Sequence, residues 1–89
     1  MKNEKTKTQR DIVDWMVEIM RIALFVNRET KHDVIINFAG HVDYFSVDVF
    51  YNGWGEMRMP DLHSEFYLTD PDCLNQCAKM WKKLDSLLR

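Results

Sequence analysis

The sequence predicts a two-layer α+β domain with the order α-β-β-β-(β)-α, in which an antiparallel sheet carries two helices on one face. Three observations lead to this prediction. Apolar residues recur at helical spacing near each end of the chain, apolar and polar residues alternate between these two segments, and turn-forming residues divide the alternating region. Helical spacing indicates a helix with one buried stripe, and alternation indicates a strand with one buried face. Elements with one apolar surface each are expected to pack those surfaces together in layers.

The first helix is predicted to begin at Thr8, because Thr8 and Asp11 resemble a capping box. One apolar stripe follows at spacings of three and four residues, and further apolar residues lie beside it. The apolar surface is therefore wider than a helix needs to cover one small sheet. These further residues are Val13, Val17, Met20, Ile22, Leu24 and Phe25.

The next segment is predicted to be a β-hairpin. Gly40 and His41 fit a two-residue type II′ turn, because glycine adopts the positive φ that its first position needs. This turn would pair Ala39 with Val42 and would bring one set of apolar residues to a common face, which both helices would cover. The set consists of Val34, Ile36, Phe38, Phe45, Val47 and Val49.

A third strand is predicted over residues 54–59. A two-residue Asn-Gly turn before it would aim Glu56 and Arg58 at the core, where two buried charges would be costly. A three-residue loop with Gly53 left-handed in a bulge avoids that cost. In this register the buried residues are Met57 and Met59.

The chain beyond Pro60 gives a weaker strand pattern, and whether residues 62–68 form a fourth strand stays open. The second helix has a clear start, with Asp70 as N-cap and Pro71 at the first helical position. Cys73 and Cys77 lie four residues apart in this helix. That spacing aims the two side chains poorly for a disulfide, so we expect two reduced thiols without a catalytic role.

The net charge of −2 conceals an uneven distribution. The first ten residues hold four bases against one acid, whereas residues 32–72 hold eight carboxylates and one base, Arg58. Residues 1–7 lack apolar periodicity and are predicted to form a disordered basic arm, so that residues 8–89 are a single domain. Neither a secretory signal nor a membrane-spanning segment is indicated, and we expect a cytoplasmic protein without membrane contact.

The second face of the sheet is the candidate functional surface. It would display aromatic and apolar side chains, which either pack across the strands, contact a partner or second copy, or stack on bases. Nucleic acid is not expected, since Arg58 is the only base among eight carboxylates. The candidate partner-binding residues are Ile35, Tyr44, Asp48, Phe50, Trp54 and Arg58.

Catalysis and metal binding have little support in the sequence. The histidines are scattered, neither CxxC nor HxxxH occurs, and all three glycines are assigned to turns, which leaves no phosphate loop. We therefore predict no catalytic residue, no cofactor, no cofactor-binding residue and no metal ligand, and expect that the protein is not an enzyme.

The run RDIVDWMVEIMRIALFVNRET, followed by VIINFAGHVDYFSVDVFYNGW, resembles small proteins carried by phages and prophages of low-GC Gram-positive bacteria. The resemblance lies in size, element order and the GHVD…NGW hairpin, covers residues 10–55 and assigns no residue a role. It implies a small cytoplasmic accessory protein. Some proteins of this kind inhibit host defence by acidic mimicry of DNA, and the acidic middle section is compatible with that activity.

Three functions follow as hypotheses. The first is a non-enzymatic protein-interaction module that forms a homodimer, with a host protein as a further possible partner. The second is an acidic inhibitor of a host nucleic-acid-binding or defence protein, and the third is a small metal-binding protein or enzyme. The dimer contact is predicted on the outer sheet face through Tyr44 and Trp54, with the wide apolar surface of the first helix as the alternative.

Overall fold

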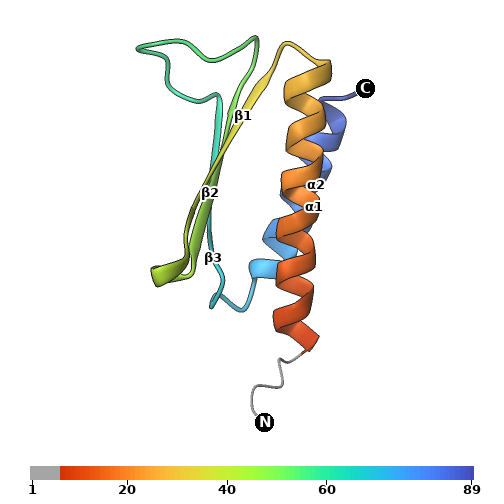
Figure 1. Ribbon diagram of the computed structural model, residues 1–89, viewed down its shortest axis with the longest axis vertical. Helices are drawn as coiled ribbons and strands as arrows, with labels where there is room; N and C mark the ends of the chain where they lie inside the picture. The colour runs from red at the N-terminus through yellow and green to blue at the C-terminus, as the bar shows by residue number, and fades with distance from the viewer. Residues whose placement is uncertain (1–6) are drawn as a thin grey trace.

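The computed structural model describes residues 7–89, with side chains from Asp11 onward, and this part of the chain has two helices and three strands. The helices are α1 (Lys7–Glu29) and α2 (Cys73–Ser86), and the strands are β1 (Asp33–Ala39), β2 (Tyr44–Phe50) and β3 (Leu62–Tyr67). The strands form an antiparallel sheet in the order β1-β2-β3, with both helices on one face (Figure 1). The predicted two-layer α+β class is confirmed. The predicted arm lies outside the described residues, apart from Lys7, where α1 begins.

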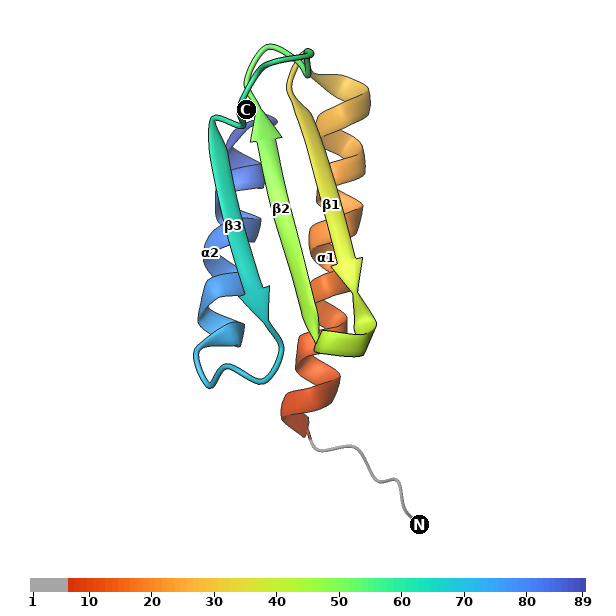
Figure 2. The ribbon, with the colours of Figure 1, turned by 90° about the vertical axis from the view of Figure 1, so that its left-hand side faces the viewer.

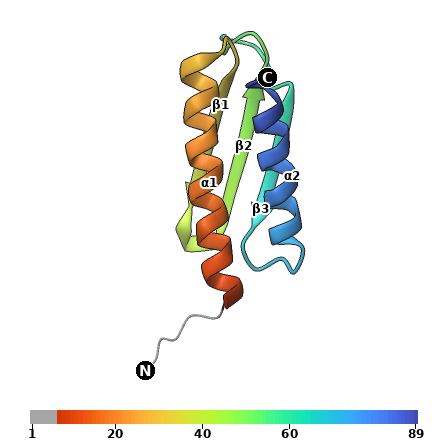
Figure 3. The same ribbon diagram turned by 90° about the vertical axis from the view of Figure 1, so that its right-hand side faces the viewer.

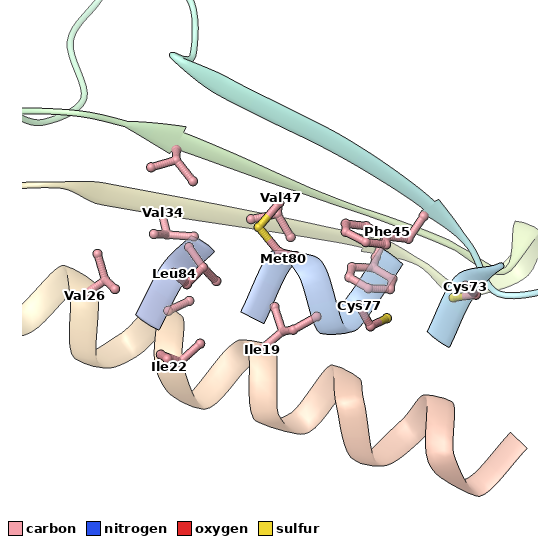
Figure 4. Close-up of a cluster of buried hydrophobic side chains, with 13 residues drawn as sticks. Ile19, Ile22, Val26, Val34, Phe45, Val47, Cys73, Cys77, Met80 and Leu84 are labelled. Atoms are coloured by element: carbon pink, nitrogen blue, oxygen red, sulfur yellow. The ribbon is translucent and has the colours of Figure 1, made fainter. Parts of the chain in front are cut away.

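The helices divide the sheet between them. α1 lies behind β1 and α2 behind β3 when the sheet is viewed from its outer face (Figure 2), and the two helices lie side by side when viewed from the opposite direction (Figure 3). The core fills the space between the layers, where Ile19, Val47 and Leu84 are almost completely buried (Figure 4). Burying a large aliphatic side chain contributes about 1.5–3 kcal/mol, so this cluster is the main source of stability.

The first hairpin keeps the predicted faces but has a longer turn. Ala39 pairs with Tyr44 and not with Val42, so the predicted two-residue type II′ turn is wrong. Residues 40–42 form a 3₁₀ turn, and the positive φ falls on Asp43 (51°) and not on Gly40. Aspartate tolerates this left-handed conformation better than most residues. Because the register differs from the prediction by two residues, each side chain stays on its predicted face.

The residue opposite Phe38 explains the longer turn. In the observed register Phe38 of β1 lies opposite Phe45, whose ring also stacks on Phe66 of β3 with the centroids 4.5 Å apart. The shorter turn would instead place Asp43 opposite Phe38, with a carboxylate directed toward the apolar face.

The third strand is residues 62–67, and the prediction of a strand over residues 54–59 is wrong. Residues 51–61 form a loop that extends from the sheet on the side away from the helices (Figure 1). Met57 and Met59, predicted to be buried, are 99% and 82% exposed, while Glu56 and Arg58 are exposed as expected.

Two features favour residues 62–67 over residues 54–59 as the third strand. Phe66 stacks on Phe45, and such an aromatic pair contributes about 0.5–1.5 kcal/mol beyond its buried area. Asp61 returns the chain to the sheet, because its N–H donates to the Val49 carbonyl at 2.9 Å and its carboxylate accepts the Tyr51 N–H at 2.7 Å. The methionines of residues 54–59 have no comparable partner.

α2 begins slightly later than predicted. The Asp70 carboxylate accepts the N–H of Asp72 at 2.8 Å, and the Asp70 carbonyl accepts the N–H of Cys73 at 3.0 Å. Residues 70–73 are therefore a turn that leads into the helix, and Asp72 and not Asp70 is the N-cap residue. Within residues 7–89, neither helix combines the length and apolar character needed to cross a membrane.

Candidate functional site: an apolar groove beside an open strand edge

An apolar groove runs between α1 and β1 on the open side of the two layers. Its volume is about 660 Å³, and its walls include Val17 and Leu24 of α1 and Phe38 of β1. These three side chains are 58%, 55% and 58% exposed. The remaining lining residues are Val13, Met16, Ile19, Met20, Arg21, Ile36, Phe45 and Leu68.

The groove is open because the sheet has too few strands to cover α1. β1 is an edge strand, and α1 lies over it, so the side of α1 that faces away from α2 extends past the sheet. The wide apolar surface predicted for the first helix is therefore real, and its excess faces solvent. Phe38 belongs to the predicted core face but lies close to the end of the edge strand, where the core does not enclose it.

The free edge of β1 is capped at one end only. The Asn27 side chain bonds both backbone groups of Val34: Oδ1 accepts its N–H at 2.6 Å, and Nδ2 donates to its carbonyl at 3.0 Å. Backbone groups alternate in direction along a strand, so those of Ile36 and Phe38 also point away from β2. No hydrogen bond within the described residues engages these groups.

A second observation supports this alternation. The Leu68 N–H donates to the Asp43 carbonyl at 2.8 Å. The backbone N–H and C=O groups of the odd-numbered residues of β2 therefore point toward β3. The backbone groups of the even-numbered residues of β2 then point toward β1. Their partners in β1 are odd-numbered, such as Ile35 opposite Asp48. The even-numbered residues of β1 are therefore on the free edge.

The two edges of the sheet differ in protection. β3 follows Pro60 and carries His63 and Glu65, and charged side chains and prolines are devices that discourage a further strand. β1 has the sequence DVIINFA, in which Asp33 is the only charged residue and proline does not occur. Its pairing with β2 contains no bulge. Its edge is therefore suited to pairing with another strand.

The outer face carries a different cluster, in which His63 lies between two carboxylates. Its Nδ1 contacts the Asp48 carboxylate across the β2–β3 pair, and its Nε2 lies 3.0 Å from Glu65 Oε2. The hydrogen bond with Asp48, followed by that with Glu65, raises the pKa of His63 above its ordinary value of 6.5. Because carboxylates occupy both ring nitrogens, the imidazole is not available to activate a nucleophile, and the cluster has the character of a cross-strand ion pair.

The sequence-predicted site residues do not gather in one place. Ile35 and Asp48 are paired neighbours on the outer face, while Tyr44 lies at its far end and packs on Tyr67 with ring centroids 5.2 Å apart. Phe50 is on the outer side of β2 but only 4% exposed. The polar residues around His63 separate the two ends of this face.

The other two predicted residues belong to the loop 51–61. Trp54 is 57% exposed, and its backbone N–H donates to Asp33 Oδ2 at 2.7 Å. The Arg58 guanidinium donates to the carbonyls of Gly53 and Tyr51 and pairs with Asp61 at 3.3 Å. Arg58 thus holds the loop together.

The two thiols are part of the core. Cys73 and Cys77 are both buried and free, as predicted. Burial raises the pKa of both, that of Cys77 to about 12, so neither is a nucleophile near neutral pH. Among the described residues, no group of three or more His, Cys, Asp or Glu side chains is arranged to hold a metal ion.

Sequence reasoning identified the helix side of the groove but not the site as a whole. The excess apolar stripe of α1 predicted that side of the groove. The capping by Asn27 and the open backbone groups of Ile36 and Phe38 depend on the strand order, which the sequence pattern does not give. The arrangement offers an apolar surface and a row of unpaired backbone groups, which together suit a polypeptide strand. Comparison of the chain with protein-family models, with curated proteins and with solved structures gives no match.

Proposed function

We propose that this chain is a non-enzymatic protein-interaction module whose contact surface is the groove between α1 and β1. The observation that carries the proposal is the continuity of Val17, Leu24 and Phe38, each more than half exposed, around one groove. Continuous exposed apolar surface is typical of protein contact sites. The sequence alternative in which α1 makes the contact thus has more support than a contact through Tyr44 and Trp54.

A small-molecule substrate fits this groove less well. Ligand sites normally contain a few polar groups that fix the orientation of the ligand. Among the residues from Asp11 onward, Arg21 is the only charged one that lines the groove, and its guanidinium lies 5.4 Å from the centre of the Phe25 ring. A protein surface needs no such orienting groups, because its own shape and backbone supply them.

The acidic-inhibitor alternative receives less support. Six of the eight carboxylates of residues 32–72 accept hydrogen bonds within the fold and so have structural roles. A mimic of DNA would need its charges directed at a partner. A cytoplasmic accessory role in a phage or prophage rests on the resemblance of residues 10–55 and is proposed only as a setting.

The test is a pair of charge substitutions in the groove. Val17→Glu with Leu24→Glu should weaken every association of the chain by more than about tenfold, which corresponds to about 1.4 kcal/mol, because two charges would have to be desolvated. Sedimentation and chemical cross-linking in host lysate measure the association, and circular dichroism checks the fold.

The matched control is Met59→Glu, which places the same charge on an exposed apolar residue outside the groove. It should leave association unchanged. If association persists with equal strength in the groove variant, the groove is not the contact surface and the proposal is wrong.

A further inference from the structure

We infer that the partner in the groove is a second copy of this chain, joined by antiparallel pairing of β1 with the same strand of that copy. This inference rests on the proposed function and names its partner. It depends on three features of the described residues: the positions of the open backbone groups, the faces of the side chains beside them, and the charges along α1.

The open backbone groups of β1 are self-complementary about Asn37. A two-fold axis at Asn37 pairs Ile36 of each strand with Phe38 of the other, and each such pair exchanges two hydrogen bonds. An axis at Ile36 would instead place Phe38 opposite Val34, whose N–H and carbonyl Asn27 already occupies. The Asn37 axis uses all the open groups and none of the occupied ones.

The same axis keeps apolar side chains together. Ile36 and Phe38 both point to the helix side of the sheet, so their pairing across the axis closes the groove of each copy with residues of the other. On the outer face Asn37 meets Asn37 of the second copy. A slip by one residue would turn these faces over. An axis at Phe38 would keep the faces but would place Ile36 opposite Gly40, whose carbonyl already accepts the Asp43 N–H.

The axis also brings α1 against α1 of the second copy. Asn27 lies beside Val34, and the three strand residues from Val34 to Asn37 span about 10 Å, which equals about seven helix residues. The axis therefore passes near Met20. In an antiparallel pair centred there, Val17 of one copy faces Leu24 of the other.

Charge complementarity follows from the same geometry. Asp14, Arg21 and Arg28 are seven residues apart and so form one row on α1, of which Arg21 lines the groove. Asp14 and Arg28 lie six and eight residues from Met20, on opposite sides of it. An antiparallel pair centred near Arg21 therefore brings the acid of each copy toward the base of the other. The two Arg21 side chains meet near the axis, and each lies 3.8 Å from Glu18 of its own helix, which offsets their repulsion. Two acid–base contacts thus still favour a second copy over an uncharged apolar partner.

Cysteine cross-linking of the full chain tests the register. Asn37→Cys should form a symmetric disulfide dimer nearly completely in micromolar solution under mild oxidation. Opposed residues of a non-hydrogen-bonded pair have Cα atoms about 4.5 Å apart, within the range of a disulfide. The native thiols are buried and should not interfere. Asn37 is exposed, so the variant should fold, and circular dichroism checks this.

Ile35→Cys is the matched control. Ile35 opposes Ala39 of the second copy in this register, so Ile35→Cys alone should give little dimer. A mixture of Ile35→Cys with Ala39→Cys should give the mixed disulfide.

The outcomes separate this inference from the proposed function. A dimer that Val17→Glu with Leu24→Glu disrupts, but that Asn37→Cys does not cross-link, overturns the β1 pairing and leaves the groove as the contact. A chain that stays monomeric at millimolar concentration, yet binds another protein or an apolar small molecule in the groove, overturns the second copy as partner. A chain with no groove-dependent association overturns both.

Discussion

At the scale of single residues, His63 shows how an exposed group acquires a defined role. Register alone places it opposite Asp48, and the two-residue alternation of the strand places Glu65 on the same face. Both carboxylates favour the charged imidazole, and these hydrogen bonds raise its pKa in the folded chain. In the unfolded chain both partners are lost, so protonation of His63 is linked to folding.

His63→Gln should therefore destabilise the chain most at low pH. The folded-state pKa lies above 6.5, so the extra stability is fully present below pH 6.5 and is lost as the pH rises through the raised value. The melting temperature of the wild type minus that of His63→Gln should be positive in weak acid and should shrink in mild alkali. His41→Gln, in the exposed turn Gly40–Val42, is the control. A difference that grows with pH would contradict this linkage.

At the scale of elements, the faces of the strands could be predicted but the lengths of the turns could not. Alternation has a period of two residues. It therefore assigns Val34 and Phe45 to the same face in the predicted register and in any register shifted from it by an even number of residues. Gly40-His41 was compatible with a two-residue turn, yet the observed register pairs Phe38 with Phe45 across a four-residue connection and keeps Asp43 out of the strand pair. That register depends on which side chains meet across the two strands, and local turn preferences carry no information about it.

The third strand was misassigned for the same kind of reason. Residues 54–59 and residues 62–67 both alternate, and the first segment follows a stronger turn signal. The partners of the second segment, Phe45 and Asp48, decide the outcome, and both lie across the sheet. For the candidate site, the sequence predicted the surplus apolar surface of α1 but not the open edge, because neighbours of β1 are a property of the assembled sheet.

The loop 51–61 gives a prediction at this scale. Gly53 has a φ of 104°, whereas Gly55 does not have a positive φ. A Cβ on Gly53 would have space, because its nearest neighbour would lie at 3.6 Å. The cost of a side chain at this position therefore comes from the positive φ and not from crowding. Gly53→Ala should therefore cost about 1–2 kcal/mol of unfolding free energy, measured by urea titration.

Gly55→Ala is the matched substitution. A Cβ there would meet the Arg58 side chain at 3.3 Å, which requires a shift of a few tenths of an ångström but no change of backbone conformation, so Gly55→Ala should cost less than Gly53→Ala. Equal losses in both variants would mean that the left-handed conformation at Gly53 is not what the loop requires.

At the scale of the whole molecule, the chain is small for the apolar surface it carries. A domain of this size buries only about 60–65% of its surface on folding, so its stability as a monomer is limited. Val17 and Leu24 remain exposed after both helices have covered the sheet. Pairing through β1 would extend three strands to six and would bury these residues, so assembly and stability should be coupled.

Thermal unfolding at several protein concentrations tests that coupling. If the dimer is the folded species, each tenfold rise in protein concentration should raise the melting temperature by about 3–6 °C. A tenfold rise stabilises the dimer by about 1.4 kcal/mol, and each of its two chains receives half of this free energy. Val17→Glu with Leu24→Glu should melt at a lower temperature that does not vary with concentration, since its chains unfold singly. Met59→Glu should keep the concentration dependence of the wild type. A wild-type melting temperature that is constant from micromolar to millimolar concentration would show that the chain completes its core alone, and that the groove is exposed in the stable state.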